Sequence, residues 1–353
     1  MHPLLSEELV NVTQLREFDE LIDVRSPTEF AEDHIPGAIN CPVLDDTERK
    51  RIGTIYKQVS NFEAKKIGAA LVARNIARHI EQIFITRKKD WRPLIYCWRG
   101  GNRSAAMVHV LEQVGWHPVR LRGGYKSYRI AVVEDLIKLP MRFQFRVICG
   151  PTGSGKSRLL KILDSLGAQV LDLEQLAAHR GSVLGSLPDT PQPSQKMFES
   201  LIWTEFHGFN PKQPVYVESE SKKIGNLHVP DTLLEAMWCG RCIRIEADLS
   251  LRGALLKEEY QHLLLDPETL LQRIELLSSH YGHDLISSWK RYVTNGQWDA
   301  LVMELLKRHY DPAYNRSIIK HYPNFRDAPI LYVKASEDAE MWRLAQSIIT
   351  TNK

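Results

Sequence analysis

The chain has 353 residues, of which 43% are apolar and 25% are charged, and its formal net charge is +3. This composition excludes a mainly disordered chain, and the length suggests two domains. No segment has the apolar length that spans a bilayer, and the first residues lack the pattern of a signal peptide. We therefore expect a cytoplasmic protein without a membrane partner.

The five cysteines are scattered along the chain, and their odd number favours reduced thiols over a disulfide framework. Cys239 and Cys242 form a C-x-x-C pair, but two thiols are only half of the ligands that a structural zinc ion requires. A helix is predicted before this pair and a strand after it, so no helix N-terminus activates either thiol. We interpret both as structural thiols and assign no metal site.

Basic residues are concentrated between Glu48 and Arg92, where twelve Lys and Arg residues stand against four acids. Such a segment attracts a polyanion such as RNA. A solvated helix face has the same composition, and for a charge run alone this second interpretation is favoured.

The first predicted domain is a small α/β domain over residues 1–127. Short apolar runs predict strands, and a helical pattern over 104–113 lies between two of them. Gly123 and Gly124 end this domain, and a connecting helix and linker are predicted over 128–142. The predicted strands are 21–24, 38–40, 94–97 and 119–121.

Cys97 ends the third of these strands and is the candidate catalytic nucleophile. Successive backbone N–H groups in the loop after it, together with the N-terminus of the next helix, would surround an anion. The helix end and two arginines would favour the thiolate, and two glycines would permit positive φ angles. A buried structural cysteine is the alternative, but the arginines and glycines favour the active loop. The loop residues are Arg99, Gly100, Gly101, Asn102, Arg103 and Ser104.

Two motifs in this domain resemble the signatures of the rhodanese family, and the resemblance implies a persulfide on Cys97. The loop from Cys97 to Arg103 is one residue longer than the usual rhodanese loop and matches the C-x5-R pattern of dual-specificity phosphatases. It would therefore suit a tetrahedral phosphorus-containing group such as selenophosphate, whereas a phosphatase also needs a general acid that the pattern does not supply. The motifs are Leu21-Ile22-Asp23-Val24-Arg25 followed by Glu29-Phe30, and His34-Ile35-Pro36-Gly37-Ala38-Ile39-Asn40.

The second predicted domain, over 143–353, is an α/β P-loop NTPase-like domain with a parallel sheet, because strand candidates alternate with helical patterns. A helical region is predicted over about 249–324, where aromatic and basic residues interleave. Such residues suit stacking on unpaired RNA bases, but aromatic side chains at helical spacing more often form a core. The strand candidates are 143–148, 169–173, 215–220, 242–247 and 330–334.

A phosphate-binding loop opens this domain and matches G-x-x-x-x-G-K-S, directly after a predicted strand and before a helical pattern. Its backbone N–H groups and the helix dipole would hold phosphates, which Lys156 neutralises, and Ser157 would reach a magnesium ion. The loop residues are Gly150, Pro151, Thr152, Gly153, Ser154, Gly155, Lys156 and Ser157.

Carboxylates follow two later strands, with Asp172 and Glu174 after one and Glu218 and Glu220 after another. A standard NTPase places an Asp at such a strand end to hold magnesium, and the lack of a clear match weakens the case for ATP hydrolysis. These acids would either order a metal ion or substrate, or cap helices, and both interpretations remain open.

Along nearly the whole chain, the order of motifs resembles the tRNA 2-selenouridine synthase family. The resemblance implies that sulfur is replaced by selenium in 2-thiouridine at the tRNA wobble position, with selenophosphate as donor. It also implies S-geranylation from geranyl diphosphate, so that the P-loop binds a diphosphate. The motifs are Asp172-Leu173-Glu174, His179-Arg180-Gly181-Ser182, Glu218-Ser219-Glu220, Lys223-Ile224-Gly225 and His309-Tyr310-Asp311-Pro312.

On this interpretation the partner is tRNA that carries 2-thiouridine, and selenophosphate and geranyl diphosphate are co-substrates. No cofactor is tightly bound, and the need for magnesium is left open. Supporting roles fall to Asp172, Arg180, Glu218 and Glu220.

Two other functions remain open. A rhodanese sulfurtransferase or phosphatase coupled to a nucleotide-binding domain would turn over thiosulfate, or consume ATP, without tRNA. A nucleotide-switched binding module would keep its function after Cys97→Ser, because both loops would only recognise anions.

Overall fold

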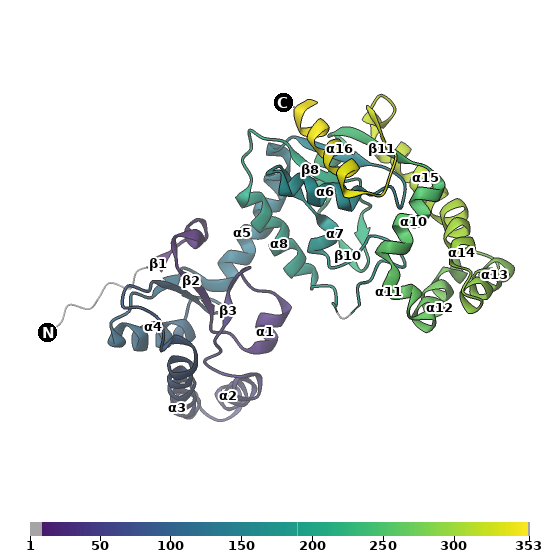
Figure 1. Cartoon of the computed structure of the whole chain (residues 1–353). Coiled ribbons are helices and arrows are strands. Elements are labelled where there is room, and N and C mark those ends of the chain that lie inside the picture. Colours follow the sequence, from purple (N-terminus) through teal and green to yellow (C-terminus); the bar gives the residue numbers. More distant parts are fainter. Residues whose placement is uncertain (1–8, 189, 352–353) are drawn as a thin grey trace. The chain divides into compact units, whose positions relative to one another are not determined.

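The computed structural model describes residues 9–188 and 190–351, and the chain divides into two compact units (Figure 1). The first unit extends to Asp135 and includes Glu199–Leu201, and the second contains Leu136–Phe198 and the chain from Ile202 onward. The division at Asp135 falls inside the predicted connecting segment, 128–142. Each unit contains a parallel sheet with helices around it, which confirms the predicted α/β class.

The sheet of the first unit has five parallel strands in the order β1-β5-β4-β2-β3. Its central strand, β4, is buried at every residue, as expected for a parallel strand. The four predicted strands are confirmed to within one residue at each end, whereas the two-residue β1 is too short to give a pattern. The strands are β1 Leu9–Val10, β2 Glu20–Asp23, β3 Ile39–Asn40, β4 Pro93–Tyr96 and β5 Val119–Leu121.

The helices of this unit bury an apolar core against the sheet, in which Phe84, Trp91 and Trp116 pack beside strand residues. The helix after the cysteine loop is confirmed, while α2 and α3 were not predicted. The helices are α1 Pro27–Glu32, α2 Asp46–Gln58, α3 Asn61–His79, α4 Asn102–Val114 and α5 Gly124–Lys138, with short helices at η1 Val12–Glu17 and η2 Ile80–Phe84.

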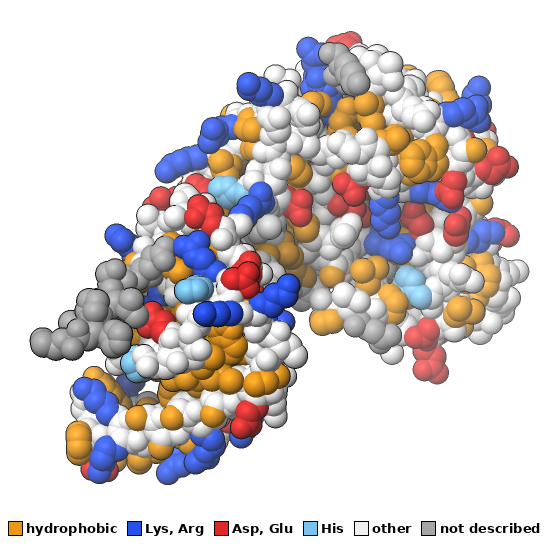
Figure 2. Space-filling view, turned by 60° about the vertical axis from the view of Figure 1, so that its left-hand side comes forward, with side chains coloured by type: hydrophobic (Ala, Val, Ile, Leu, Met, Phe, Trp, Pro, Cys, Tyr) orange, Lys and Arg blue, Asp and Glu red, His pale blue; other side chains and the backbone are white. Residues whose placement is uncertain are grey.

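The basic segment between Glu48 and Arg92 falls largely on α2 and α3, and ten of its twelve Lys and Arg side chains are exposed. In Figure 2 the lowest part of the molecule, where α2 and α3 lie, carries basic side chains around apolar ones. Exposure fits both interpretations of this segment, because a solvated face and an RNA-binding face both require it.

A buried ion pair joins Asp23 and Arg25, two residues of the first rhodanese-like motif. Arg25 is 1% exposed, and its Nη2 lies 2.6 Å from Asp23 Oδ2 and 2.6 Å from the carbonyl oxygen of Asp33. The Arg25 guanidinium also lies over the Tyr125 ring, 3.9 Å from its centroid. One side chain thus joins the end of β2, the segment after α1 and the first turn of α5.

Replacing Arg25 by Met should lower the free energy of unfolding by about 3 kcal/mol or more, because it leaves the Asp23 carboxylate buried without its partner. Urea unfolding of the full chain measures this loss. Lys66→Gln is the control, since the Lys66–Glu63 pair is about half exposed and should contribute less than about 1 kcal/mol. Equal losses in the two variants would contradict the prediction.

The sheet of the second unit also has five parallel strands, in the order β12-β11-β6-β8-β7. Apolar residues of α6 and α16 form a core with strand residues such as Ile148 and Tyr216. All five predicted strands are confirmed, with ends that differ by up to two residues. They are β6 Phe145–Cys149, β7 Gln169–Leu171, β8 Val215–Glu218, β11 Arg241–Ala247 and β12 Ile330–Val333.

A run of helices between β11 and β12 confirms the predicted helical region. Its core contains Trp289, which is fully buried, with Tyr292, Trp298 and Tyr310 packed against it. The core interpretation of these aromatic residues is therefore confirmed. The helices are α10 Leu249–Glu259, α11 Gln261–Leu264, α12 Pro267–Glu275, η4 Leu276–Ser279, α13 His283–Thr294, α14 Trp298–Leu305, η5 Leu306–Tyr310, α15 Asp311–His321 and η6 Pro323–Phe325.

The remaining helices lie on or beside the sheet, and α9 contacts β6. Cys239 follows α9 and is exposed, Cys242 is buried in β11, and all five cysteines are free thiols. No helix in the described part of the chain has the length and apolar character to cross a membrane. The remaining elements are η3 Pro140–Arg142, α6 Lys156–Ser165, α7 Leu173–Leu176, α8 Gln195–Gly208, α9 Asp231–Trp238, α16 Asp338–Thr351 and an unpredicted hairpin of β9 Lys223–Ile224 and β10 Leu227–His228.

Candidate functional site

Cys97 follows β4, and the predicted loop curls around its sulfur atom. The Gly101 N–H donates to Cys97 Sγ at 3.2 Å, and Ser104 Oγ lies 3.3 Å from the same atom. Ser104 is fully buried, and its hydroxyl also donates to the Gly101 carbonyl at 3.0 Å. One backbone N–H and one hydroxyl of the loop thus contact the sulfur.

The sequence predicts positive φ angles at both glycines of this loop, and the structure has a positive φ at one of them. Gly100 has φ +65°, as expected, whereas Gly101 has φ −95° and needs no glycine for its backbone angle. Gly124, the first residue of α5, also has a positive φ, +59°. A Cβ added at Gly124 would lie 2.2 Å from the Cys97 carbonyl oxygen. The Tyr125 N–H donates to that carbonyl at 2.8 Å, so the first turn of α5 holds the cysteine backbone.

The two loop arginines have different surroundings. Arg99 is exposed, whereas Arg103 Nη1 lies 2.8 Å from Glu29 Oε2, and Arg49 Nε lies 3.1 Å from the same oxygen. Burial would raise the pKa of Glu29, but the hydrogen bond from Arg103 and the nearby positive charges lower it below its ordinary value. Glu29 thus balances the charge of Arg103. Glu29 belongs to the first rhodanese-like motif, but the sequence does not show this contact.

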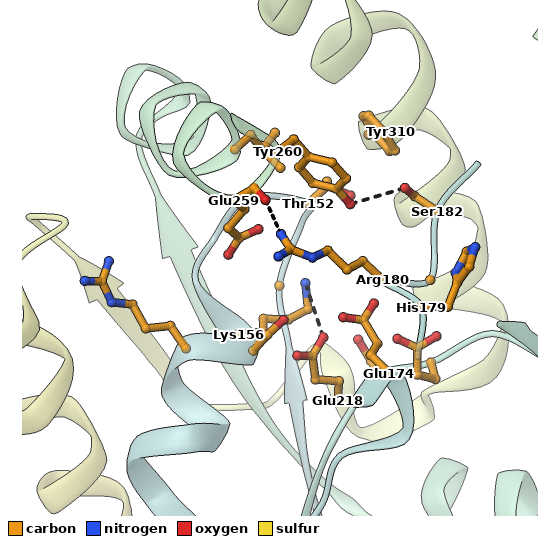
Figure 3. A pocket seen from close by; sticks show the side chains of 18 of the residues that line it. Thr152, Lys156, Glu174, His179, Arg180, Ser182, Glu218, Glu259, Tyr260 and Tyr310 are labelled. Carbon is orange, nitrogen blue, oxygen red and sulfur yellow. Dashed lines mark hydrogen bonds and ion pairs between the residues drawn. The ribbon is translucent and has the colours of Figure 1, made fainter. Parts of the chain in front are cut away.

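The P-loop begins directly after β6, and its lysine faces a carboxylate. Gly153 and Gly155 have φ angles of +79° and +82°, which give the loop its wrap. Lys156 Nζ lies 4.0 Å from Glu218 Oε2 and 3.5 Å from the Pro151 carbonyl oxygen (Figure 3). Because Glu218 pairs with Ile148 in the parallel register of β8 and β6, it ends its strand beside the loop.

Arg252 of α10 holds the P-loop from outside and was not predicted. It is 6% exposed, and its Nε donates to the Thr152 carbonyl oxygen at 2.9 Å. Its Nη1 and Nη2 donate to the two carboxylate oxygens of Asp311 at 3.1 and 2.5 Å. This bidentate pair connects the phosphate loop to two helices of the helical region.

Replacing Arg252 by Met should lower the free energy of unfolding by about 2 kcal/mol or more, because charge-assisted hydrogen bonds to Thr152 and Asp311 are lost. It should also weaken pyrophosphate binding, since the Thr152 carbonyl is no longer held. Urea unfolding and calorimetric titration with pyrophosphate measure the two effects. Arg308→Met, which removes an exposed i,i+4 pair with Glu304, is the control and should change neither.

Three carboxylates converge next to the P-loop. One oxygen from each of Glu174, Glu218 and Glu220 can be chosen so that all three atoms lie within 4.8 Å of one another. Asp172 instead caps α7, since its Oδ1 accepts from the Gln175 N–H at 2.9 Å. Asp172 is thus a helix cap that also lines the cavity, while the other three acids form a group there.

The group is electrostatically crowded. Burial raises the pKa of Glu174 well above its ordinary value, and the charges of Glu218 and Glu220 raise it further. Burial likewise raises the pKa of Glu218, against the opposing charge of Lys156. Burial, followed by repulsion from Glu218, raises the pKa of Glu220 to about 8. The carboxylates therefore favour protonation or a bound cation over three free negative charges.

A cavity of about 840 Å³ lies over the P-loop, and its walls differ in chemistry (Figure 3). Arg180 lies across it, donates to the Glu259 carbonyl oxygen at 2.5 Å and lies 5.2 Å from the centroid of the Tyr260 ring. The polar wall contains the P-loop and the carboxylates. The apolar and aromatic wall is formed by Val183, Leu187, Leu255, Leu256, Tyr260, Tyr310, Ala313 and Tyr314.

Comparison with known proteins agrees with this arrangement in both units. The family model described as the tRNA 2-selenouridine synthase AAA domain matches residues 143–290, and the Rhodanese-like domain model matches residues 7–131. A tRNA 2-selenouridine synthase from Sulfurovum sp. is 31% identical over 336 residues, which are 84% of this chain and 88% of that protein. The chain belongs to the tRNA 2-selenouridine synthase family.

Other members of the family are slightly more similar over shorter stretches. The synthase from Nitrosomonas europaea is 35% identical over 72% of this chain and 66% of its own length. The synthase from Hydrogenovibrio crunogenus is 36% identical over 68% of this chain and 67% of its own length. The matched stretch is thus about two thirds of these two relatives.

The structure brings the predicted residues of this family member into two groups. In the first, Gly101 and Ser104 contact the Cys97 sulfur, whereas Arg103 contacts Glu29 and Arg99 is exposed. The second joins the P-loop to Arg180, Glu218 and Glu220. Glu174 was among the acids for which the sequence left open a role in ordering a metal ion or substrate, whereas Arg252 and Tyr260 were missed. Asp311, which pairs with Arg252, lies in the motif His309-Tyr310-Asp311-Pro312. That motif is the part of the sequence analysis that pointed to this contact.

The stability of this family member should depend on pH through Glu220. The folded protein keeps a proton on Glu220 up to about pH 8, while an ordinary glutamate loses it near 4.5. The stabilising contribution is therefore complete below about pH 4.5 and is lost as the pH rises through about 8. The free energy of unfolding should fall over this window, by at most about 1.4 kcal/mol per pH unit for one proton.

Urea unfolding in EDTA at several pH values tests this dependence. Glu220→Gln should make the fall shallower, because the amide does not titrate. Glu258→Gln is the control, since Glu258 is exposed at the rim of the same cavity. A wild-type slope that Glu220→Gln leaves unchanged would contradict the prediction.

Proposed function

We propose that this protein replaces the sulfur of 2-thiouridine at the tRNA wobble position by selenium, using selenophosphate and geranyl diphosphate. Membership of the family supports a tRNA-modifying enzyme, and the relatives are named tRNA 2-selenouridine synthases. The selenotransferase and geranyltransferase steps are the finer part of the proposal, and the geometry of the two loops supports them.

The observation that carries the proposal is the two-sided cavity over the P-loop. Lys156 and backbone N–H groups provide a diphosphate site, while Leu255, Leu256 and Tyr260 provide an adjacent hydrocarbon wall. A prenyl diphosphate has this combination of a doubly charged head and an apolar tail. A cavity volume of about 840 Å³ is within the range of pockets that enclose small molecules.

In the first step, the sulfur of 2-thiouridine attacks the allylic carbon of geranyl diphosphate. A carbon–sulfur bond forms, the carbon–oxygen bond to the diphosphate breaks, and N3 of the base loses its proton to solvent. Lys156 and the P-loop N–H groups stabilise the negative charge that develops on the departing diphosphate. Alkylation makes the sulfur a better leaving group for the next step.

In the second step, selenium derived from selenophosphate at the Cys97 loop adds to C2 of the base. A carbon–selenium bond forms, the carbon–sulfur bond breaks, and geranyl thiol leaves with a proton from solvent. Water attacks the phosphorus of selenophosphate, the phosphorus–selenium bond breaks and phosphate leaves, so that no oxidant or reductant is required. The N–H of Gly101 and the hydroxyl of Ser104, both close to Cys97 Sγ, fit a loop that handles such an anion.

Two variants should separate these steps. Cys97→Ala should lower selenation by several orders of magnitude and spare geranylation, because it removes the thiol at the centre of the loop that handles selenophosphate. Lys156→Ala should slow geranylation by about 100-fold, because it removes the charge that faces the leaving diphosphate. Mass spectrometry of nucleosides from 2-thiouridine tRNA, with each co-substrate omitted in turn, measures both steps.

Matched controls are Cys239→Ala and Lys212→Ala, which alter an exposed thiol and an exposed ammonium outside both loops. Both should behave as wild type. If Cys97→Ala and Lys156→Ala lost the same step, the division of labour between the two loops would be wrong.

A nucleotide-dependent enzyme is the second candidate, and the position of Glu218 favours it. Glu218 ends a strand next to that of the P-loop, which is where a P-loop NTPase places its magnesium partner. Release of phosphate from ATP or GTP without tRNA, together with no geranylated nucleoside, would support this candidate over the proposed function.

A further inference from the structure

We propose that a second cavity, next to the P-loop cavity, binds a nucleotide of the tRNA strand, with Arg273 and Lys223 in contact with its phosphate groups. The cavity has a volume of about 930 Å³, and all its described lining residues belong to the second unit. This volume is within the range of pockets that enclose small ligands. The sequence analysis assigned no ligand to this part of the chain.

The two cavities share part of their walls. Ala178, His179 and Gly181 line both of them, as do four further residues of the segment after α7. A base held in the second cavity would therefore lie next to a ligand bound by the P-loop. This step rests on the function proposed above, in which the sulfur of the base attacks a prenyl diphosphate.

The two cavities differ in charge. The P-loop cavity contains the carboxylates of Glu174, Glu218 and Glu220, which repel a polyanion. None of the described residues that line the second cavity is Asp or Glu, whereas Arg273 and Lys223 both line it. Arginine and lysine side chains supply the phosphate contacts of nucleic-acid sites. The second cavity is therefore the better place for an RNA strand.

The two cations are carried by backbone that the fold holds in place. Arg273 lies in the last turn of α12, which packs against α13. Lys223 begins β9, and Gln192 fixes the hairpin of β9 and β10. Gln192 Nε2 donates to the Ile224 carbonyl oxygen at 2.9 Å, and its Oε1 accepts from the Asn226 N–H at 2.8 Å. The cavity thus has a positive charge on each of two separately supported elements.

An independent observation is a buried histidine in the shared wall. His179 is 6% exposed, and among the described residues its Nδ1 has no hydrogen-bond partner. Burial lowers the pKa of the His179 imidazole, and the charge of Arg273 lowers it further, so the ring is neutral at neutral pH. A buried polar atom without a partner is unfavourable, and a base edge or a ribose hydroxyl would supply the missing interaction.

The backbone beside this histidine is strained. Ala178 has φ +47° and is the only residue other than glycine with a positive φ in the described part of the chain. Such a residue keeps this conformation only where its surroundings hold it. Here the His179 N–H donates to the Glu174 carbonyl oxygen at 3.0 Å, and the Arg180 N–H donates to the Gly185 carbonyl oxygen at 2.7 Å. The fold therefore maintains an unfavourable backbone angle to keep His179 in the shared wall.

Binding of an anticodon stem-loop RNA with 2-thiouridine at the wobble position tests the site in the full-length protein. Fluorescence anisotropy measures the affinity without selenophosphate or prenyl diphosphate. Arg273→Gln and Lys223→Gln should each weaken binding by about tenfold and make its salt dependence shallower by about one unit of log–log slope. Lys222→Gln is the matched control, because Lys222 is the exposed neighbour of Lys223 and does not line the cavity. It should bind the RNA as the wild type does.

A second measurement uses the wild type alone and covers the case in which a variant fails to fold. The same RNA with 4-thiouridine at the wobble position should, on irradiation, cross-link to residues 178–187, 223–226 or 273–276, as located by mass spectrometry. Wild-type affinity in the folded Arg273→Gln and Lys223→Gln variants, or cross-links only at other positions, would overturn the proposal. RNA binding in this cavity without any geranylated or selenated nucleoside would support the site and contradict the proposed function alone.

Discussion

Parallel pairing of β6 with β8 is the constraint on which the P-loop site depends. The chain leaves β6 at Cys149 and enters the phosphate loop, while the register places Glu218 opposite Ile148 at the same edge of the sheet. An ammonium and a carboxylate therefore meet where both strands end. Because side chains alternate along a strand, a slip of one residue would turn Glu218 to the other face and remove it from the loop.

The phosphate loop is not held by its own hydrogen bonds alone. Arg252 reaches it from α10 and is itself positioned by Asp311 of α15, so two helices of the helical region help to hold the loop. The same region provides Tyr260 and Leu256 to the cavity wall. Its buried aromatic residues stabilise this wall, which explains why helices rich in tyrosine and tryptophan follow β11.

The sequence predicted the position of a site where its motif consists of consecutive residues. The Cys97 loop and the P-loop each consist of a strand, a glycine-containing turn and a helix start, so local pattern predicted their positions. It failed where contacts join distant segments. Glu29 with Arg103, and Arg252 with Thr152, are separated by 74 and 100 residues, and no spacing rule connects them.

The group of Glu174, Glu218 and Glu220 also depends on a contact between segments that are distant in the sequence. Asp172 and Glu174 stand two residues apart and both line the cavity, yet Asp172 caps α7 whereas Glu174 joins the carboxylate group. The two residues look alike in the sequence, so spacing alone does not predict which of them joins the group.

Gly124 limits how the Cys97 loop can be redesigned. Since any Cβ there would collide with the Cys97 carbonyl, and since Tyr125 and Lys126 donate to the carbonyls of Cys97 and Trp98, the base of the loop is fixed to the start of α5. Libraries aimed at new sulfur or selenium donors should therefore keep Gly124 and vary Arg99, whose side chain is exposed.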